Sequence, residues 1–416
     1  MHLAQRELPS PAAPPPVLPD APGRLAFVDN LRVFIIMMVL THHAGNPYGG
    51  DPPDFWYFDD QVPHSHAVSL CTMLNPSFTM AVLLIFSGYL LPSSYDRRTF
   101  GPYVRDKFIR LGIPLVFGAL VMLPLLQYTY HLNFGYRRYA SFWDYYWQAW
   151  HGLGPKPPGW NGPGWPDRNL AHLWYIEHLF FYAVLYGLWR RFAVSPGETK
   201  VIPRPAPRMA AIFLFALAVS LATFAVRIFC PLHKVYALFG FLQIDMSHFP
   251  QWLPFFFVGI LAHRYQWLTT LPKSTGMAWL AITIVLVAFY FVFGFSRWGA
   301  MWWFDAEGRA NVGFNLACLT KSVWESFFCV GAAIGLIVLF REKLNRQGRL
   351  AIILAGSAYA VHVFHPPLIV GLQYLMAHVP LSVFAKYVVV SLLGIPLCYA
   401  AAHYVILRLP FARRIL

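Results

Sequence analysis

The sequence predicts an all-α, polytopic membrane protein built as a bundle of about ten transmembrane helices. Composition is the first reason, since 57% of the 416 residues are hydrophobic and 12% are charged, compared with about 25% charged in soluble proteins. Apolar stretches of roughly the 20 residues that a helix needs to cross a bilayer recur along the chain. The segments between these stretches are alternately rich and poor in Lys and Arg, which indicates a fixed orientation in a membrane.

Ten apolar segments predict the spans in chain order. They are 27–44, 76–92, 111–130, 171–189, 209–229, 249–263, 276–295, 322–340, 350–375 and 385–407. The first and the sixth are short or interrupted by polar residues. Residues 1–23 contain SPAAPPPVLPDAPG and lack both the basic start and the apolar centre of a secretory signal. We therefore expect a disordered cytoplasmic tail at 1–23 and a single membrane domain over 24–416.

The basic residues predict the orientation of the bundle. With a cytoplasmic amino terminus, the inside segments hold 21 Lys and Arg residues and the outside segments hold 10, while Arg32 lies within a span. The positive-inside rule then places both termini in the cytoplasm, and we expect the inner (plasma) membrane of a bacterium. This orientation accounts for the net charge of +14 without a nucleic-acid partner. The five cysteines have no metal-ligand spacing, and their odd number argues against a full disulfide framework, while a pair among Cys71, Cys230 and Cys318 stays open.

Ionisable residues in the first span, DNLRVFIIMMVLTHHAG (29–45), indicate a function beyond anchoring, because such groups are costly in hydrocarbon. Arg32 and His43 are eleven residues apart, so on a straight helix they share a face to within about 20° and lie roughly 16 Å apart. His42 points about 100° away from His43. Histidine accepts a proton near neutral pH, so His43 is a candidate general base, although a buried histidine that only forms structural hydrogen bonds is an alternative.

Two regions outside the first span have two possible functions each. Basic residues before the third span, including Arg98, Arg105, Lys107 and Arg110, suit a polyphosphorylated nucleotide, or they are the ordinary positive-inside signal with anionic lipid. The aromatic loop 131–169 is an interfacial belt or a stacking platform for a flat-faced acceptor.

Ionisable residues also occur in later spans. His172, Glu177, His178 and Glu325 lie in or beside the fourth and eighth spans. Such groups usually face the interior of a bundle, where they serve chemistry or pair structurally.

The chain resembles the acyltransferase-3 family of ten-span membrane O-acyltransferases, which includes the glucan succinyltransferase type. The family typically has an Arg, ten intervening residues and a His in its first span, here Arg32 to His43. The resemblance continues through FSGYLL (86–91), YVRDKFIRLGIPLVFG (103–118), HLWYIEHLFFY (172–182) and GSAYAVHVFHPPLIV (356–370). It covers nearly the whole chain from about residue 24.

The resemblance implies transfer of an acyl group, acetyl or succinyl, from cytoplasmic acyl-CoA to a hydroxyl of a carbohydrate or glycan acceptor, without a metal. It identifies His43 as the catalytic residue and Arg32 as its paired motif residue. The family often has Arg-x-x-Arg at the third span, where this chain has Lys107 and Arg110, and lysine lacks the planar fork that arginine offers a phosphate.

The ninth span completes the set of expected site residues. Ser357, Tyr359 and His365 fit the family pattern, while His362 stands where a tyrosine is frequent. We expect Tyr359 to assist catalysis, and Glu177, His172, Ser357 and His365 to contact the substrate. The donor phosphates are expected on Arg98, Arg105, Lys107 and Arg110.

The main alternative is a transporter or flippase of a lipid-linked or acylated sugar, with the intramembrane Arg and His lining its path. No repeat and no pair of interrupted spans supports that alternative. A membrane glycosyltransferase would carry more carboxylates placed for sugar chemistry. Spans that are poor in acidic residues and contain histidines favour acyl transfer.

Overall fold

The structure is a computed structural model, and it describes residues 25–49, 56–60, 62–133, 139–158, 165–193, 201–232, 234–304 and 308–416. The tail expected at 1–23 lies outside these residues. The chain is 76% helical with almost no strand. This composition of secondary structure confirms the predicted all-α class.

Long helices make up the bundle. They are α1 (Ala26–Gly45), α3 (Pro76–Asp96), α8 (Trp174–Phe192), α9 (Met209–Arg227), α10 (Phe249–Tyr265), α12 (Lys273–Gly294), α14 (Leu316–Lys343), α15 (Arg349–Ala377) and α16 (Val383–Tyr404). One more long helix is continuous over Phe100–Asn133 and consists of α4 (Phe100–Lys107), the π-helical η2 (Phe108–Gly112), α5 (Ile113–Phe117), the π-helical η3 (Gly118–Met122) and α6 (Leu123–Asn133).

Short elements connect the long helices. They are η1 (Asn46–Tyr48), α2 (His66–Leu74), α7 (Phe142–Tyr145), η4 (Tyr146–Trp150), η5 (Ala171–Leu173), α11 (Trp267–Thr270), α13 (Arg297–Trp302), η6 (Arg309–Asn311), η7 (Ile406–Arg408) and α17 (Ala412–Ile415). Strands β1 (Val235–Leu238) and β2 (Leu242–Asp245) form an antiparallel hairpin in which Val235 pairs with Asp245.

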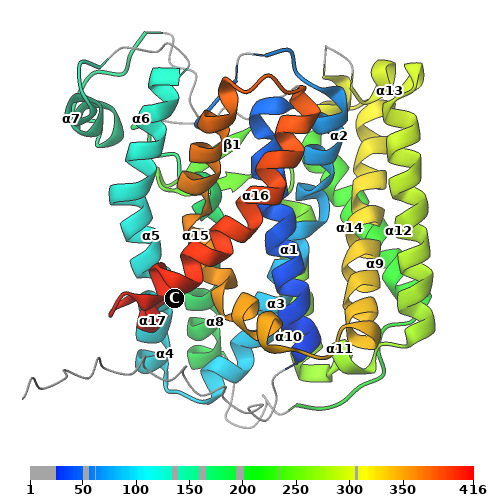
Figure 1. Ribbon diagram of the computed structural model, residues 1–416. Helices are drawn as coiled ribbons and strands as arrows, with labels where there is room; N and C mark the ends of the chain where they lie inside the picture. The colour runs from blue at the N-terminus through cyan, green and yellow to red at the C-terminus, as the bar shows by residue number, and fades with distance from the viewer. Residues whose placement is uncertain are drawn as a thin grey trace, which may run out of the picture.

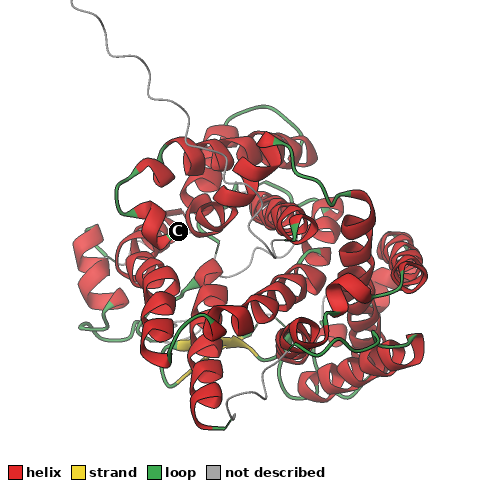
Figure 2. Cartoon of the chain, turned by 90° about the horizontal axis from the view of Figure 1, so that it is seen from below, coloured by secondary structure: helices red, strands yellow, loops and turns green. Residues whose placement is uncertain are grey.

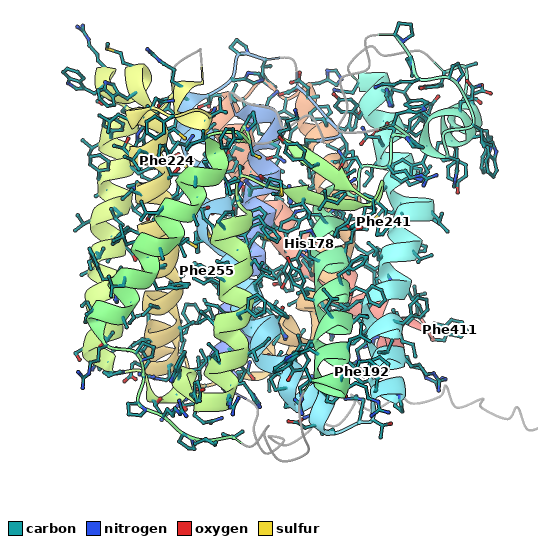
Figure 3. The ribbon with its side chains drawn as sticks, turned by 180° about the vertical axis from the view of Figure 1, so that it is seen from behind. His178, Phe192, Phe224, Phe241, Phe255 and Phe411 are labelled. Carbon is teal, nitrogen blue, oxygen red and sulfur yellow. The ribbon has the colours of Figure 1, made fainter. Side chains whose placement is uncertain are left out.

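Eight of the ten predicted spans correspond to helices that are long and apolar enough to cross a membrane. The other two, α8 and α10, run in the bundle beside them, with His178 of α8 and Phe255 of α10 at mid-height (Figure 3). Helix α10 has 17 residues, and α8 carries Glu177, Arg190 and Arg191 within its 19 residues. Their shortness and their charges separate these two helices from the eight.

The bundle has two chemically different ends. We call the end that carries α4, α11 and α17 the basic end, and the end that carries α7 and α13, nearer to which the β-hairpin lies, the hairpin end (Figure 1). Helices α1 and α15 both begin at the basic end and run toward the hairpin end. Viewed from the basic end, most helices are seen nearly end-on, with the two strands at one side (Figure 2).

Helix α1 lies at the centre of the packing. It contacts α2, α3, α14, α15 and α16, and the neighbouring positions of α1, α15 and α16 are visible in Figure 1. Twelve of its 20 residues are buried, including Leu31, Ile35, Leu40 and His43. An ionisable residue on α1 therefore lies inside the bundle, which is where the predicted function requires it.

Glycines allow two helix pairs to approach closely. A Cβ at Gly88 of α3 would overlap the Phe256 carbonyl of α10, and a Cβ at Gly259 of α10 would overlap the Ile85 carbonyl of α3. Gly331 and Gly335 of α14, which have the small-xxx-small spacing, face α12 in the same way. Small residues of this kind are the usual means of close helix packing in membranes.

Two segments were not predicted as regular structure. Helix α2 occupies part of the predicted outer loop 45–75 and is separated from α3 at Asn75, where Pro76 begins α3. Proline is favoured at a helix start and interrupts the ladder behind it. The β-hairpin lies in the loop between the fifth and sixth predicted spans.

Candidate active site

His43 lies in the last turn of α1 and is 7% exposed. Asn46, one helical turn further along, is hydrogen-bonded to His43 Nδ1 at 3.2 Å. The indole of Trp56 stacks on the imidazole, with ring centroids 4.7 Å apart and an interplanar angle of 7°, and His365 stacks on it at 5.0 Å. Among the described residues, the hydrogen bond of this ring is made at Nδ1, and Nε2 has no partner.

Gln373 of α15 fixes Trp56 over His43. Its Oε1 accepts a hydrogen bond from the Trp56 indole at 2.9 Å, and its Nε2 donates to the His43 carbonyl at 3.0 Å. The Gln373 side chain is fully buried. One amide thus joins the loop that carries Trp56 to the end of α1.

Three further histidines gather beside His43. His365 and His362 lie on α15 and His172 lies in η5, and all three are buried. The His365 ring is 5.0 Å from that of His172 and 6.2 Å from that of His362, centroid to centroid. In the part of the chain that the structure describes, no three His, Cys, Asp or Glu residues are arranged to hold a metal ion.

Two prolines determine where the rings of His365 and His172 donate. Pro366 and Pro367 lie inside α15, and each lacks the N–H that would bond the carbonyl four residues earlier. The freed carbonyl of His362 accepts from His365 Nδ1 at 2.9 Å, and the freed carbonyl of Val363 accepts from His172 Nε2 at 3.0 Å. The sequence HPP therefore organises both histidines.

Arg32 lies near the basic end of α1. Its Nη2 bonds Asp29 Oδ1 at 3.0 Å and the Ala355 carbonyl of α15 at 3.1 Å. Its Nε is buried without a partner among the described residues. Arg32 and His43 thus both contact α15, at two levels of the same helix pair.

Two expected site residues on α15 donate to backbone carbonyls. The Tyr359 hydroxyl donates to the Arg110 carbonyl at 2.6 Å, where the π-helical turn η2 disturbs the regular ladder. The Ser357 hydroxyl donates to the Ile353 carbonyl one turn earlier in its own helix, at 2.9 Å. Both residues lie nearer to the level of Arg32 than to that of His43.

The four expected phosphate-binding residues lie at the basic end, on α4, η2 and the link between α3 and α4. Arg98 and Arg110 both approach Asp106 Oδ1, at 3.3 and 3.5 Å. The Arg110 side chain is 62% exposed, and Arg105 is also exposed. Lys107 lies over the Tyr103 ring, 5.4 Å from its centroid. One carboxylate among four cations leaves this group strongly positive.

Glu177 and His178 of α8 hold the β-hairpin. Glu177 Oε2 accepts from the Gln243 backbone N–H at 3.1 Å, and His178 Nε2 donates to the Gln243 carbonyl at 2.8 Å. His178 Nδ1 also accepts from the Tyr182 hydroxyl. Neither residue is brought to the His43 ring. Glu325, the other ionisable residue noted within a span, forms a buried ion pair with Arg227 of α9.

Among the described aromatic residues of the loop 131–169, some are exposed and others are buried. Trp143 and Trp147 are 62% and 50% exposed, as in an interfacial belt. Tyr145 is buried and donates to Asp167 Oδ2 at 3.0 Å. Burial, together with the Asp167 charge, raises the pKa of both Tyr145 and Tyr57. These two tyrosines therefore keep their protons at neutral pH.

Comparison with known proteins identifies the family. The model of the acyltransferase-3 family, described as an acyltransferase domain, matches residues 25–403. The chain belongs to the acyltransferase-3 family. Searches of the curated proteins and of the solved structures found no significant match. Because the match covers all the long helices, this acyltransferase-3 protein is a membrane acyltransferase, and the family favours acyl transfer over the transporter alternative.

Three residues around His43 in this acyltransferase-3 protein were not identified from the sequence. Asn46 had a detectable signal, since a residue three positions after a helical histidine lies beside it. Gln373 is a polar residue near the end of the ninth predicted span. Trp56 belongs to an aspartate-rich loop, and its contact with His43 depends on the folding of that loop over α1.

Proposed function

We propose that this acyltransferase-3 protein transfers an acetyl or succinyl group from cytoplasmic acyl-CoA to a hydroxyl of a carbohydrate or glycan, with His43 as general base. The observation that carries the proposal is the His43 ring, buried inside the bundle, hydrogen-bonded at Nδ1 and without a partner at Nε2 among the described residues. A positioned imidazole of this kind is suited to taking a proton from an attacking hydroxyl.

The tautomer of His43 depends on the orientation of the Asn46 amide. Asn46 Nδ2 lies 3.2 Å from His43 Nδ1, and a flip of the amide exchanges its nitrogen and oxygen, which are assigned from the hydrogen-bond network. We propose the flipped orientation for the reacting enzyme, in which His43 Nδ1 donates to Asn46 Oδ1 and Nε2 carries the free lone pair. His43 Nε2 is then the basic atom, as in other enzymes where a neighbouring group fixes the tautomer of a catalytic histidine.

The donor would enter from the basic end. Its phosphates would meet Arg98, Arg105, Lys107 and Arg110, because guanidinium and ammonium groups form charge-assisted hydrogen bonds with phosphate. The pantetheine arm would then pass Arg32 and deliver the thioester to His43, about 16 Å further along α1. The Tyr359 hydroxyl donates to the Arg110 carbonyl, so Tyr359 would lie beside the donor where its phosphates join the pantetheine arm.

The acceptor would enter from the hairpin end. This end carries Trp56 against His43 and the protonated tyrosines Tyr57 and Tyr145 near Asp167. Aromatic faces combined with polar groups suit a sugar ring. We expect the substrate-binding role assigned to His172 and His365 to be exercised here or along the donor arm, since both rings lie beside His43.

The reaction balances without another reactant. His43 Nε2 takes the proton of the acceptor hydroxyl as its oxygen bonds to the thioester carbonyl carbon. The tetrahedral intermediate then breaks its C–S bond, and the departing thiolate takes the proton from the imidazolium. The products are the O-acyl ester and coenzyme A with a free thiol. Negative charge on the carbonyl oxygen needs an N–H or O–H donor close to His43.

Radiolabelled donors test the proposal. Purified protein in lipid nanodiscs is incubated with labelled acetyl-CoA or succinyl-CoA and with cell-envelope glycans, and base-labile label on the glycan is measured. We expect one donor to label the glycan and His43→Ala to abolish labelling while remaining inserted and folded. Normal turnover by His43→Ala would exclude His43 as the base, and absence of label with every donor would contradict the proposed reaction.

A further inference from the structure

The histidines beside His43 have buried ring nitrogens without hydrogen-bond partners. Among the described residues, His365 Nε2, His172 Nδ1 and both nitrogens of His362 are unpartnered. The three side chains are at most 5% exposed. Buried polar atoms are nearly always hydrogen-bonded in proteins, so four unpartnered atoms in one cluster point to a bound polar group as their partner.

The hydrogen-bonding capacity of these atoms is known for two rings. His365 donates through Nδ1 and His172 donates through Nε2, each to a carbonyl that a proline has freed. In a neutral ring the other nitrogen is an acceptor, so His365 Nε2 and His172 Nδ1 can each accept one hydrogen bond from a ligand. The unbonded ring of His362 offers one donor and one acceptor.

A ligand that satisfies this cluster presents both a donor, N–H or O–H, and an acceptor atom. A secondary amide has this combination. Its N–H would reach a free acceptor nitrogen of His365 or His172, and its C=O would accept from the N–H of His362. No charged group of the described residues is needed in the match, which separates this position from the phosphate-binding residues at the basic end.

The position of His362 along α15 indicates which amide of the donor's pantetheine arm would lie beside it. His362 precedes His365 by three residues, which places it about 4.5 Å nearer to the basic end. In an extended pantetheine arm, the thioester sulfur and the first amide nitrogen are separated by two methylene groups, or about 4 Å. A thioester at the level of the His43–His365 stack would therefore place this amide at the level of His362.

We propose that His362, with His172 and His365, forms a hydrogen-bonding site for the first amide of the donor's pantetheine arm, the amide next to the thioester. This inference rests on the proposed function. It assigns His362 as a residue that binds the pantetheine arm of the acyl donor. Pro366 and Pro367 free the two carbonyls to which His365 and His172 donate, and so they make the other nitrogen of each ring an acceptor.

A series of truncated donors tests the assignment. Purified protein is assayed with acyl-CoA, acyl-pantetheine, S-acyl-N-acetylcysteamine, which keeps only the first amide, and an S-acyl alkanethiol of the same length without an amide. We expect the unaltered protein to use S-acyl-N-acetylcysteamine about tenfold better than the amide-free thioester in kcat/KM, the factor of a typical hydrogen bond.

Two variants locate that preference. His362→Phe keeps the ring shape and should lose the preference, using both small donors alike, while His362→Gln, which retains one donor and one acceptor, should recover part of it. His403→Phe, on the α16 surface away from the cluster, is the matched control and should behave as the unaltered protein. Because the His362 ring makes no hydrogen bond with described residues, His362→Phe should leave the melting temperature unchanged or raise it.

Each outcome has one reading. If His362→Phe keeps the tenfold preference, or slows both small donors equally, the amide assignment is wrong although acyl transfer stands. A large fall in melting temperature together with equal slowing would assign His362 to folding and also overturn the inference. If the unaltered protein uses no thioester at all, the proposed function itself fails.

Discussion

Asn46 is hydrogen-bonded to His43 Nδ1 at 3.2 Å and is itself buried. Removing its amide leaves Nδ1 without a partner and allows the ring to adopt the other tautomer. We expect Asn46→Ala to lower kcat by about tenfold to a hundredfold, the range of one or two lost hydrogen bonds, while the KM for the acyl donor stays near its original value. Steady-state kinetics with the preferred acyl-CoA measure both constants.

Asn75 provides the control for Asn46→Ala. It is also a buried asparagine, and it donates to the Met38 carbonyl of α1 at 3.2 Å without reaching the imidazole. Asn75→Ala should reduce stability but leave kcat of the folded fraction near normal. An equal loss of kcat in both variants would show that general loosening of α1, not orientation of His43, limits the rate.

His42 has a different environment from His43. Its Nδ1 donates to the Thr72 carbonyl of α2 at 2.9 Å, and its ring meets that of His43 edge-on at 5.0 Å. We expect His42→Ala to retain at least a tenth of the activity because a packing contact is lost and the base is kept. Labelling of the acceptor, normalised to folded protein, provides the comparison with His43→Ala, and equal loss in the two variants would contradict separate roles for the two faces of α1.

Residues within one helix were accessible from the sequence, and residues brought together by the fold were not. The Arg32–His43 spacing follows from helical geometry alone. The stack of Trp56 on His43 joins residues of two different segments, and the bridge from Trp56 to Gln373 joins segments more than 300 residues apart. No local pattern encodes such contacts, so Trp56 and Gln373 could be identified only in the folded chain.

Helices α3 and α10 depend on paired glycines for their close contact. An alanine at Gly259 would place its Cβ against the Ile85 carbonyl, which belongs to helix backbone and cannot swing aside. We expect Gly259→Ala to destabilise the protein by about 1–3 kcal/mol, the usual range for overpacking. Thermal unfolding in nanodiscs measures the change.

Gly371 of α15 is the matched control for that substitution. A Cβ there meets no heavy atom within 4 Å, so Gly371→Ala should be neutral or stabilising by up to about 1 kcal/mol, the helix-propensity difference between the two residues. Similar destabilisation at both positions would mean that helix flexibility, not close packing, is the reason for the glycines.

The turn η2 presents Arg110 at the basic end. Its side chain is 62% exposed and approaches Asp106 at 3.5 Å, so its replacement should leave the fold intact. We expect Arg110→Ala to raise the KM for acyl-CoA by about tenfold or more, as for a lost charge-assisted contact to phosphate. The KM for acyl-pantetheine, which lacks the nucleotide, should not change.

Arg191 of α8 is an exposed arginine at the same end and serves as the control for Arg110. Arg191→Ala should leave the KM for acyl-CoA near its original value. An unchanged KM in Arg110→Ala, or an equal rise in both variants, would remove the assignment of Arg110 to the donor phosphates.

At the level of elements, hydrophobic length predicted the long helices and missed the shorter pieces. The apolar segment 76–92 corresponds to α3. Helix α2 before it has nine residues, which is too short for the length criterion of a membrane span. The β-hairpin is held by Glu177 and His178 of α8 through Gln243. That support comes from a distant helix, so the hairpin segment has no strong signal of its own.

The orientation of the whole bundle can be measured with two cysteine substitutions. Thr99 is exposed at the basic end, and Leu153 is 76% exposed at the hairpin end. In a Cys230→Ser background, we expect a membrane-impermeant maleimide to label Leu153→Cys in intact spheroplasts and Thr99→Cys only after lysis, because the basic end should face the cytoplasm. The reverse labelling pattern would place the donor site on the wrong side for cytoplasmic acyl-CoA.

The Trp56 indole, held flat on the His43 ring by Gln373, affects how much of the acyl donor is lost to hydrolysis in the proposed reaction. A histidine that activates a sugar hydroxyl activates water equally well, and an unprotected base beside a bound thioester would waste metabolic fuel by hydrolysis. The indole keeps solvent away from that face of the imidazole. The lone pair of Nε2 lies in the plane of the ring, so the proposed acceptor hydroxyl reaches it along the ring edge with the indole still in place.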